Sequence, residues 1–171
     1  MLLSLYRSAL VFGCLAAAIP TLAGEPLPSP SGPVILIVSG KLGVTNAPGE
    51  ARFDREMLAS LPQAVYVSYT DWTNGPQRFE GVLLKDVIAR IDGSGQEIVA
   101  SALNDYKATI PFSDLDEYPV LLALSQNGAA MSVRDKGPIW IIYPDPEPAG
   151  EFVNHHSNAK MVWQLERLQL R

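Results

Sequence analysis

Short apolar segments, separated by turns rich in glycine, proline and asparagine, are the feature that most limits how this chain can fold. Residues 34–38 and 139–143 are apolar runs of strand length, and both indicate buried strands. Between residues 65 and 70 two kinds of side chain alternate, which predicts a strand with two chemically different faces. Further strands are expected at residues 97–101, at residues 106–110 and on both sides of Asn127-Gly128, a strong hairpin signal.

Helical signals are few and short. Leu84, Val87 and Ile88 recur at helical spacing, so a helix is predicted there. Asp54 can accept hydrogen bonds from the free amides of a first helical turn, and Pro62 would end that helix. Because no strand–helix–strand rhythm repeats, we predict an α+β fold, mixed and mainly β.

The N-terminus differs in composition from the rest. Residues 1–23 are typical of a secretory signal peptide, with Arg7 as the one early charge before an apolar stretch. A retained membrane helix is the alternative, but Pro20 interrupts a run that is short for a hydrocarbon core of about 30 Å. Residues 24–33 are a proline-rich leader, and residues 34–171 are predicted to form a single domain. We therefore expect an exported protein.

Cysteine content and net charge limit the kinds of site and of partner that this chain can have. Cys14 is the only cysteine, and removal of the signal peptide would leave none. A mature chain without cysteine has no disulfide, no thiolate metal site and no cysteine nucleophile. The formal net charge is −5, without a basic stripe that would suit nucleic acid. Small molecules or proteins are the expected partners.

Four polar clusters fall in loops or at strand ends, where a rigid scaffold commonly presents binding residues: 70–72, 104–106, 134–136 and 155–160. Each also has an ordinary explanation. Asn104 and Asp105 suit a simple turn, since both side chains can bond their own backbone. Trp72 suits two roles, as a cover for the edge of the core or as a stacking platform for a flat ring.

Arg134 offers paired donors for a carbonyl or a carboxylate, and the alternative is a surface salt bridge with Asp135 or Asp116, worth about 0–1 kcal/mol. His155 and His156 are adjacent, so they cannot easily aim at one metal ion, and a solvated loop is favoured. No nucleophile triad and no phosphate-binding glycine loop is present. The residues alone indicate a ligand pocket more than a reaction.

Four ordered segments carry a family resemblance: TDWTNGPQRFEGVLLKDVI, ALNDYKATIP, GAAMSVRDKGPIWIIYP and NAKMVWQLERLQL. Together they resemble the oxidoreductase molybdopterin-binding domain, and more closely the small exported pterin-binding proteins with that sulfite-oxidase fold. The resemblance extends from about residue 34 to residue 171. In the enzymes of the family a cysteine of a C-x-G-N motif ligates molybdenum. Ser101 and Leu103 occupy the cysteine and glycine positions here, before Asn104.

The resemblance implies a site for a reduced pterin, without molybdenum. Such a flat ring needs an aromatic wall and a few fixed polar partners. Residues in the matching segments provide both, with the tryptophan and tyrosine as the wall and the others as the polar edge. The predicted ligand-binding residues are Trp72, Asn104, Asp105, Tyr106, Ser132, Arg134, Asp135, Lys136, Ser157 and Asn158.

The small exported relatives relay pterin status from the periplasm to inner-membrane enzymes of cyclic di-GMP turnover. The resemblance therefore implies a periplasmic sensory protein without turnover, whose partner is the periplasmic domain of an inner-membrane diguanylate cyclase or phosphodiesterase. The alternative is a molybdopterin-dependent oxidoreductase that lacks the usual cysteine ligand. A third possibility is an accessory protein that keeps the scaffold and binds neither ligand.

Overall fold

The structure is a computed structural model that describes residues 26–145 and 158–171. The predicted signal peptide, Cys14, Ser157 and the histidine pair lie outside the described residues. Within the described ranges, no helix is long and apolar enough to span a membrane.

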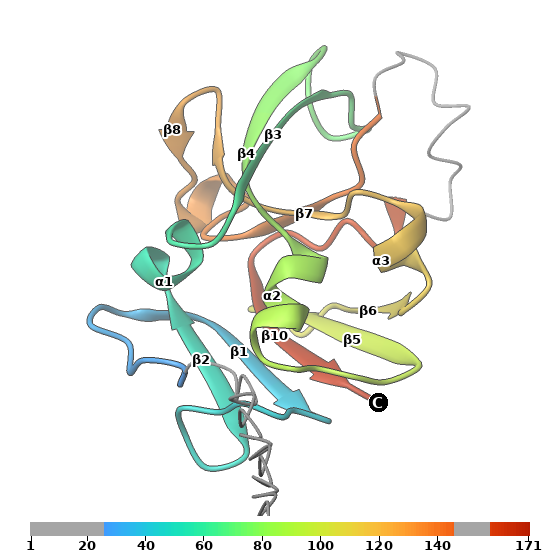
Figure 1. The fold of residues 1–171 in the computed structure, drawn as a ribbon. Helices are drawn as coiled ribbons and strands as arrows, with labels where there is room; N and C mark the ends of the chain where they lie inside the picture. Colours follow the sequence, from blue (N-terminus) through green and yellow to red (C-terminus); the bar gives the residue numbers. More distant parts are fainter. Residues whose placement is uncertain (1–25, 146–157) are drawn as a thin grey trace, which may run out of the picture.

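Two mainly antiparallel sheets form the framework (Figure 1). The first has the order β2 (Glu50–Asp54), β1 (Val34–Gly40), β10 (Leu165–Leu170), β5 (Glu97–Ala102) and β6 (Lys107–Pro111). The second has the order β3 (Gln63–Ser68), β4 (Gln77–Leu83), β7 (Leu121–Gln126) and β8 (Ala129–Ala130), and β9 (Trp140–Ile142) also pairs with β7. The helices are α1 (Arg55–Ala59), α2 (Leu84–Arg90), α3 (Asp114–Glu117) and the 3-10 turn η1 (Val133–Asp135). The prediction of a mixed, mainly β, α+β fold is confirmed.

Strands from opposite ends of the domain lie side by side in the first sheet. β1 pairs in parallel with β10, so that Gly40 lies opposite Leu170. Gly40 has a φ of +103°, and a Cβ there would come within 2.0 Å of the Leu170 carbonyl oxygen. Only glycine fits this position, because both the backbone angle and the close approach exclude a side chain.

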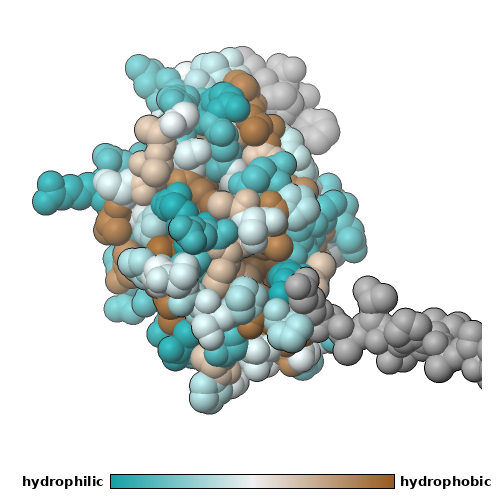
Figure 2. Space-filling model, turned by 60° about the vertical axis from the view of Figure 1, so that its left-hand side comes forward, coloured by the Kyte–Doolittle hydropathy of each residue, from teal (hydrophilic) through white to brown (hydrophobic). Residues whose placement is uncertain are grey.

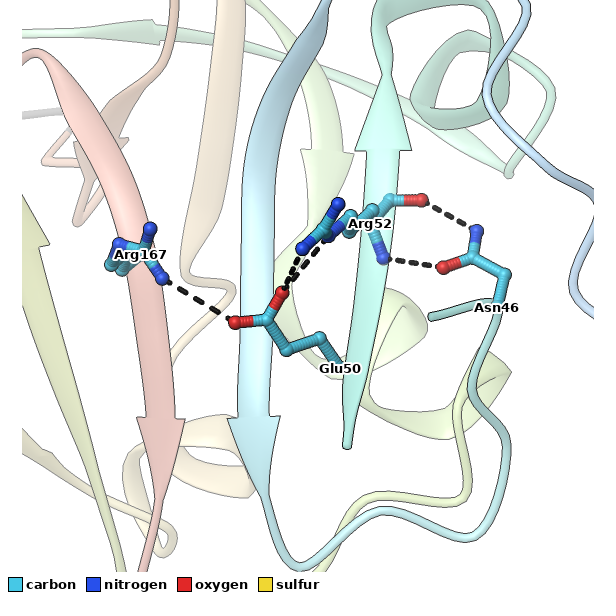
Figure 3. A network of polar contacts seen from close by, with 4 residues as sticks. All are labelled: Asn46, Glu50, Arg52 and Arg167. Carbon is cyan, nitrogen blue, oxygen red and sulfur yellow. Dashed lines mark hydrogen bonds and ion pairs between the residues drawn. The ribbon is translucent and has the colours of Figure 1, made fainter. Parts of the chain in front are cut away.

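A polar network crosses the outer surface of this sheet (Figure 3). The Glu50 carboxylate pairs with Arg52 at 2.8 Å and with Arg167 of β10 at 3.6 Å. Asn46 fixes the neighbouring backbone, because its side chain accepts from the Arg52 amide and donates to the Arg52 carbonyl, each at 2.8 Å. Pairs this exposed contribute about 0–1 kcal/mol each, so the core carries most of the stability.

The main core lies where the two sheets and α2 meet, and Figure 1 shows α2 between them. Leu84, Val87 and Ile88 are buried, so the helical spacing in the sequence correctly predicted the inner face of α2. A second cluster lies on the other side of β4 and β7 and consists of Phe79, Leu121, Ala123, Met131, Trp140 and Ile142. This second cluster supports the candidate site described below.

The outer surface is mixed, and Figure 2 shows hydrophobic patches among hydrophilic residues on one face. Val65 and Val67 are 48% and 60% exposed on β3, which is an edge strand. Their alternation with less exposed neighbours confirms that this strand has two different faces.

Asp54 caps α1 as the sequence predicted. Its Oδ1 accepts from the Met57 amide at 2.8 Å, and its Oδ2 accepts from the amides of Ser31 and Gly32 at 2.7 and 2.8 Å. These donors, led by the Met57 amide, lower the pKa of the Asp54 carboxyl. Leu27 is only 7% exposed and belongs to the main core. The segment before β1 is thus fixed to the domain by one carboxylate and one buried side chain.

Replacing Asp54 with alanine is expected to lower the free energy of unfolding by about 1–2 kcal/mol at neutral pH, the usual size for a lost helix cap. The pKa is lower in the folded state, so this contribution is present above the unfolded value of about 3.9 and is lost as pH falls through the folded value. Urea unfolding at pH 7 and at pH 2.5 measures it, with exposed Asp116→Ala as the control. An equal difference at both pH values would contradict the role of the ionised carboxylate.

Several local expectations need correction. Neither β2 nor β4 was predicted, and β4 begins at residue 77, directly after the turn residues Asn74, Gly75 and Pro76. The hairpin is confirmed, since Asn127 and Gly128 have φ values of +52° and +79°, but β8 ends at Ala130. The sequence Ser113-Asp114-Leu115-Asp116 is a plausible capping arrangement for a short helix, yet the Ser113 side chain makes no capping bond to α3.

Candidate functional site

A cavity of about 310 Å³ opens where three connecting segments meet. One segment follows β3, one follows β5, and the third precedes β10. The lining residues are mostly apolar or aromatic and are Trp72, Asn104, Tyr106, Asn158, Ala159, Met161, Val162 and Trp163. Four of the ten predicted ligand-binding residues therefore line one cavity: Trp72, Asn104, Tyr106 and Asn158.

The three tryptophans of the chain form a cluster behind and around this cavity. Trp72 and Trp163 both line it, with ring centroids 5.4 Å apart and planes at 86°. Trp140 is fully buried beneath them, with its centroid 6.3 Å from that of Trp72 and 5.4 Å from that of Phe79. Edge-to-face packing of this kind holds the rings in fixed orientations. Trp72 thus both covers the core edge and faces the cavity.

Asn104 and Tyr106 come from the turn after β5. The Asn104 side chain accepts from the Tyr106 amide at 3.2 Å, and Asp105 has a φ of +65°. This is the turn chemistry expected from the sequence, and it also places two side chains in the cavity wall. The Tyr106 hydroxyl donates to the Ala159 carbonyl at 2.8 Å and so joins two sides of the cavity. Asp105 lies in the same turn but does not line the cavity.

A side-chain bond connects the loop after β3 to the segment before β10. The Asn158 amide donates to the carboxylate of Asp71, which directly precedes Trp72. The Trp72 backbone amide donates to the Thr70 hydroxyl at 3.3 Å, and the hydroxyls of Thr70 and Thr73 are 2.9 Å apart. These bonds fix the loop that carries Trp72 against the opposite wall.

The predicted charged residues form a separate turn. The Ser132 hydroxyl donates to the Asp135 carboxylate at 2.7 Å, and the Lys136 ammonium lies 5.2 Å from the Trp140 ring centre. Arg134 is exposed and, in the part of the chain that the structure describes, makes no salt bridge with Asp135 or Asp116. None of the four predicted residues in this turn lines the cavity, and their part in ligand binding stays a prediction.

A buried charge cluster lies behind the segment before β10. Asp114 is 4% exposed, and its Oδ2 accepts from the Tyr143 hydroxyl and from the Lys160 ammonium, both at 2.7 Å. Burial, together with the bond to Asp114, raises the pKa of Tyr143 well above its usual range, so this hydroxyl remains a donor. The cluster does not line the cavity.

Comparison with known proteins identifies the family of this chain. The family described as "Oxidoreductase molybdopterin binding domain" matches residues 53–147. The chain belongs to this family. The crystal structure of the sulfane dehydrogenase SoxCD from Paracoccus pantotrophus is similar with a TM-score of 0.58 and 18% identity, over 78% of this chain and 37% of that one. The present chain thus spans well under half of that protein, and the likeness shows the shared fold. No curated protein matches the chain.

A molybdopterin-type cofactor has a ring part and a metal part, and the described residues suit them unequally. The cavity of this family member offers aromatic walls and two asparagine amides, which suit a flat heterocycle. No group of three or more acidic, histidine or cysteine residues that could hold a metal occurs among residues 26–145 and 158–171. Ser101, which the family resemblance places at the cysteine position, lies in β5 and does not line the cavity. The site therefore fits the ring part and lacks a thiolate for the metal.

Trp163, Met161 and Val162 were not predicted from the sequence, although they line the cavity. The signal for Trp163 was available, since an aromatic residue lies within the quoted segment NAKMVWQLERLQL. Met161 and Val162 are 3% and 1% exposed, so their burial alone indicates core residues. Their second role follows only from the tertiary structure, which brings this segment to the loop after β3.

Proposed function

We propose that this chain is a periplasmic pterin-binding sensory protein that relays its ligand state to an inner-membrane enzyme of cyclic di-GMP turnover. The observation that carries the proposal is the tryptophan-walled cavity in a molybdopterin-binding domain that contains no cysteine, since the only cysteine of the chain is Cys14. The signal-peptide pattern at residues 1–23 and the resemblance to small exported pterin-binding proteins support the location and the partner.

The cavity chemistry matches a reduced pterin. A volume of about 310 Å³ lies at the small end of ligand sites, which span about 300–1,000 Å³, so a bicyclic ring fits better than a larger cofactor. Trp72 and Trp163 offer ring faces and edges on which the heterocycle can pack. The amides of Asn104 and Asn158 each combine donors with an acceptor, as the aminopyrimidine edge of a pterin requires.

Relay of the ligand state requires that the ligand favour one conformation over another. The loop with Trp72 is held to the opposite wall by the bond between Asp71 and Asn158. A ring bound in the cavity against Trp72 and Trp163 adds contacts to both sides and so favours the arrangement in which the loop and the wall are joined. The surface of that loop would then report occupancy to the membrane partner.

A molybdopterin-dependent oxidoreductase is the second candidate, and the family match favours it directly. In that function the aromatic walls would hold the ring part of the cofactor, and this chain would act without a cysteine ligand. The two functions differ in metal content, in the mass of the bound molecule and in turnover with a redox dye.

The deciding experiment is to export the full chain in a bacterial host, purify it without oxygen and identify by mass spectrometry the small molecule that denaturation releases. We expect a metal-free reduced pterin at about one molecule per chain. Elemental analysis for molybdenum on the same sample is the matched measurement. A molybdopterin together with stoichiometric molybdenum would replace the sensory function with the enzymatic one.

A further inference from the structure

The wall formed by residues 158–163 decides the shape of the cavity. Of the eight described residues that line the cavity, it supplies five: Asn158, Ala159, Met161, Val162 and Trp163. This segment is not a strand, so its position depends on individual bonds from its neighbours. Trp140 donates from Nε1 to the Met161 carbonyl at 3.2 Å, and the Ile141 amide donates to the Val162 carbonyl at 2.9 Å. These bonds hold the wall through its backbone.

Lys160 is the residue of this wall whose side chain is turned away from the cavity. Its neighbours Ala159 and Met161 line the cavity, whereas the Lys160 ammonium reaches back to Asp114 in α3 at 2.7 Å. The two side chains are only 21% and 6% exposed. An ion pair withdrawn from water in this way is less screened than a surface pair and holds its geometry more tightly.

The surroundings of Asp114 make this contact hard to replace. The same carboxylate oxygen accepts from Tyr143, whose hydroxyl donates a proton but brings no charge. Lys160 is the cation that neutralises Asp114 among the ion pairs of the described residues. Its ammonium also lies 5.6 Å from the Tyr143 ring centre. The wall is therefore fixed to α3 through one charge and one aromatic contact.

We propose that Lys160, through Asp114, is a positioning residue that sets the place of the cavity wall and thereby the affinity for the ring that the cavity binds. The expected change in ligand affinity rests on the proposed pterin-binding function. Lys160 does not touch the ligand in this arrangement. It acts by holding the backbone on both sides of Lys160, from Ala159 to Met161, in the place that keeps Trp163 packed edge to face against Trp72 at the cavity.

The test compares the full chain with Lys160→Met, which keeps the length of the side chain, and with Lys160→Arg, which keeps the charge. A double variant, Asp114→Asn with Lys160→Met, removes both charges, so that no unpaired carboxylate is buried if Lys160→Met alone fails to fold. Exposed Lys85→Met is the control for loss of one positive charge. Thermal unfolding identifies the variants that remain folded.

Two readouts are taken on the folded variants. Acrylamide quenching of tryptophan fluorescence reports whether Trp72 and Trp163 are still covered, and it needs no ligand. Anaerobic titration with tetrahydrobiopterin reports affinity. We expect Lys160→Met and the double variant to bind about tenfold more weakly, a usual size for residues that orient direct ligands, and Lys160→Arg to restore most of the affinity. Quenching should increase in the weakened variants and stay unchanged in Lys85→Met.

The outcomes separate the two proposals. If the double variant regains both stability and wild-type affinity, Lys160 serves folding alone and the inference is overturned. If the wild-type chain binds no tetrahydrobiopterin, the pterin function fails, and quenching alone then decides whether Lys160 positions the wall. Unchanged quenching in both the single and the double variant would overturn the positioning role.

Discussion

Replacing Trp140 with alanine is expected to lower the free energy of unfolding by about 3–5 kcal/mol, the range observed when a large buried aromatic side chain is truncated. Trp140 is fully buried at the centre of the second core cluster, and its ring packs edge-on against Phe79 and Trp72. Its Nε1 also donates to the Met161 carbonyl. The substitution therefore leaves a cavity and a carbonyl without its partner.

Urea unfolding followed by circular dichroism measures this change. Val65→Ala is a suitable control, because Val65 is 48% exposed on an edge strand and should change the stability by less than about 0.5 kcal/mol. Trp140→Phe should fall between the two, since it keeps an aromatic ring but loses the donor. A loss below about 1 kcal/mol for Trp140→Ala would mean that the second cluster repacks easily, contrary to the usual rigidity of a packed core.

The parts of the fold that could be predicted from the sequence are those determined by local patterns. The apolar runs at residues 34–38 and 139–143 correspond to β1 and β9. β9 is buried along its whole length and must therefore be apolar on both faces, whereas in β1 only Leu36 and Val38 are buried. The Asn127-Gly128 turn formed because both positions require positive φ, which these residues accept at low cost. In each case the local sequence alone indicates the secondary structure that forms.

The strands that were not predicted contain too few apolar residues for a local sequence pattern to indicate them. β2 has the sequence EARFD, in which only Ala51 and Phe53 are buried apolar residues. It forms because β1 beside it offers a paired edge from Val34 to Ser39. Likewise, residues 77–79 follow turn residues in the sequence, but pairing with β3 makes them a strand.

The residues of the cavity were predicted only in part, because local sequence patterns do not show which segments meet in the fold. Asn104 and Tyr106 lie in one turn, so a local argument could place them together. Trp163 faces Trp72 only because β10 inserts between β1 and β5, which no local pattern reveals. In the charged turn Ser132 and Asp135 bond to each other and Lys136 lies over Trp140, away from the cavity, so the role of this turn in ligand binding stays a prediction. Local chemistry thus identifies candidate groups, while topology decides which of them meet.

Replacing Trp163 with alanine is expected to weaken tetrahydrobiopterin binding by about tenfold or more, because losing one stacked aromatic contact costs about 1–3 kcal/mol. Trp163 is half-buried and lines the cavity beside Trp72, against which it packs edge to face, so its removal opens the cavity on one side. The fold should persist, since the fully buried Trp140 remains. Anaerobic fluorescence titration of the purified full chain measures the affinity, and Trp163→Phe should keep most of it.

Two controls make this experiment decisive for the site. Tyr66→Ala removes an aromatic residue that packs on the same cluster but does not line the cavity, so it should bind normally once its stability is matched. Arg134→Ala tests the charged turn, because a loss as large as that of Trp163→Ala would bring Arg134 into the ligand site. If Trp163→Ala instead binds as tightly as the wild type, the ring does not pack against Trp163, and the charged turn becomes the alternative place for the ligand.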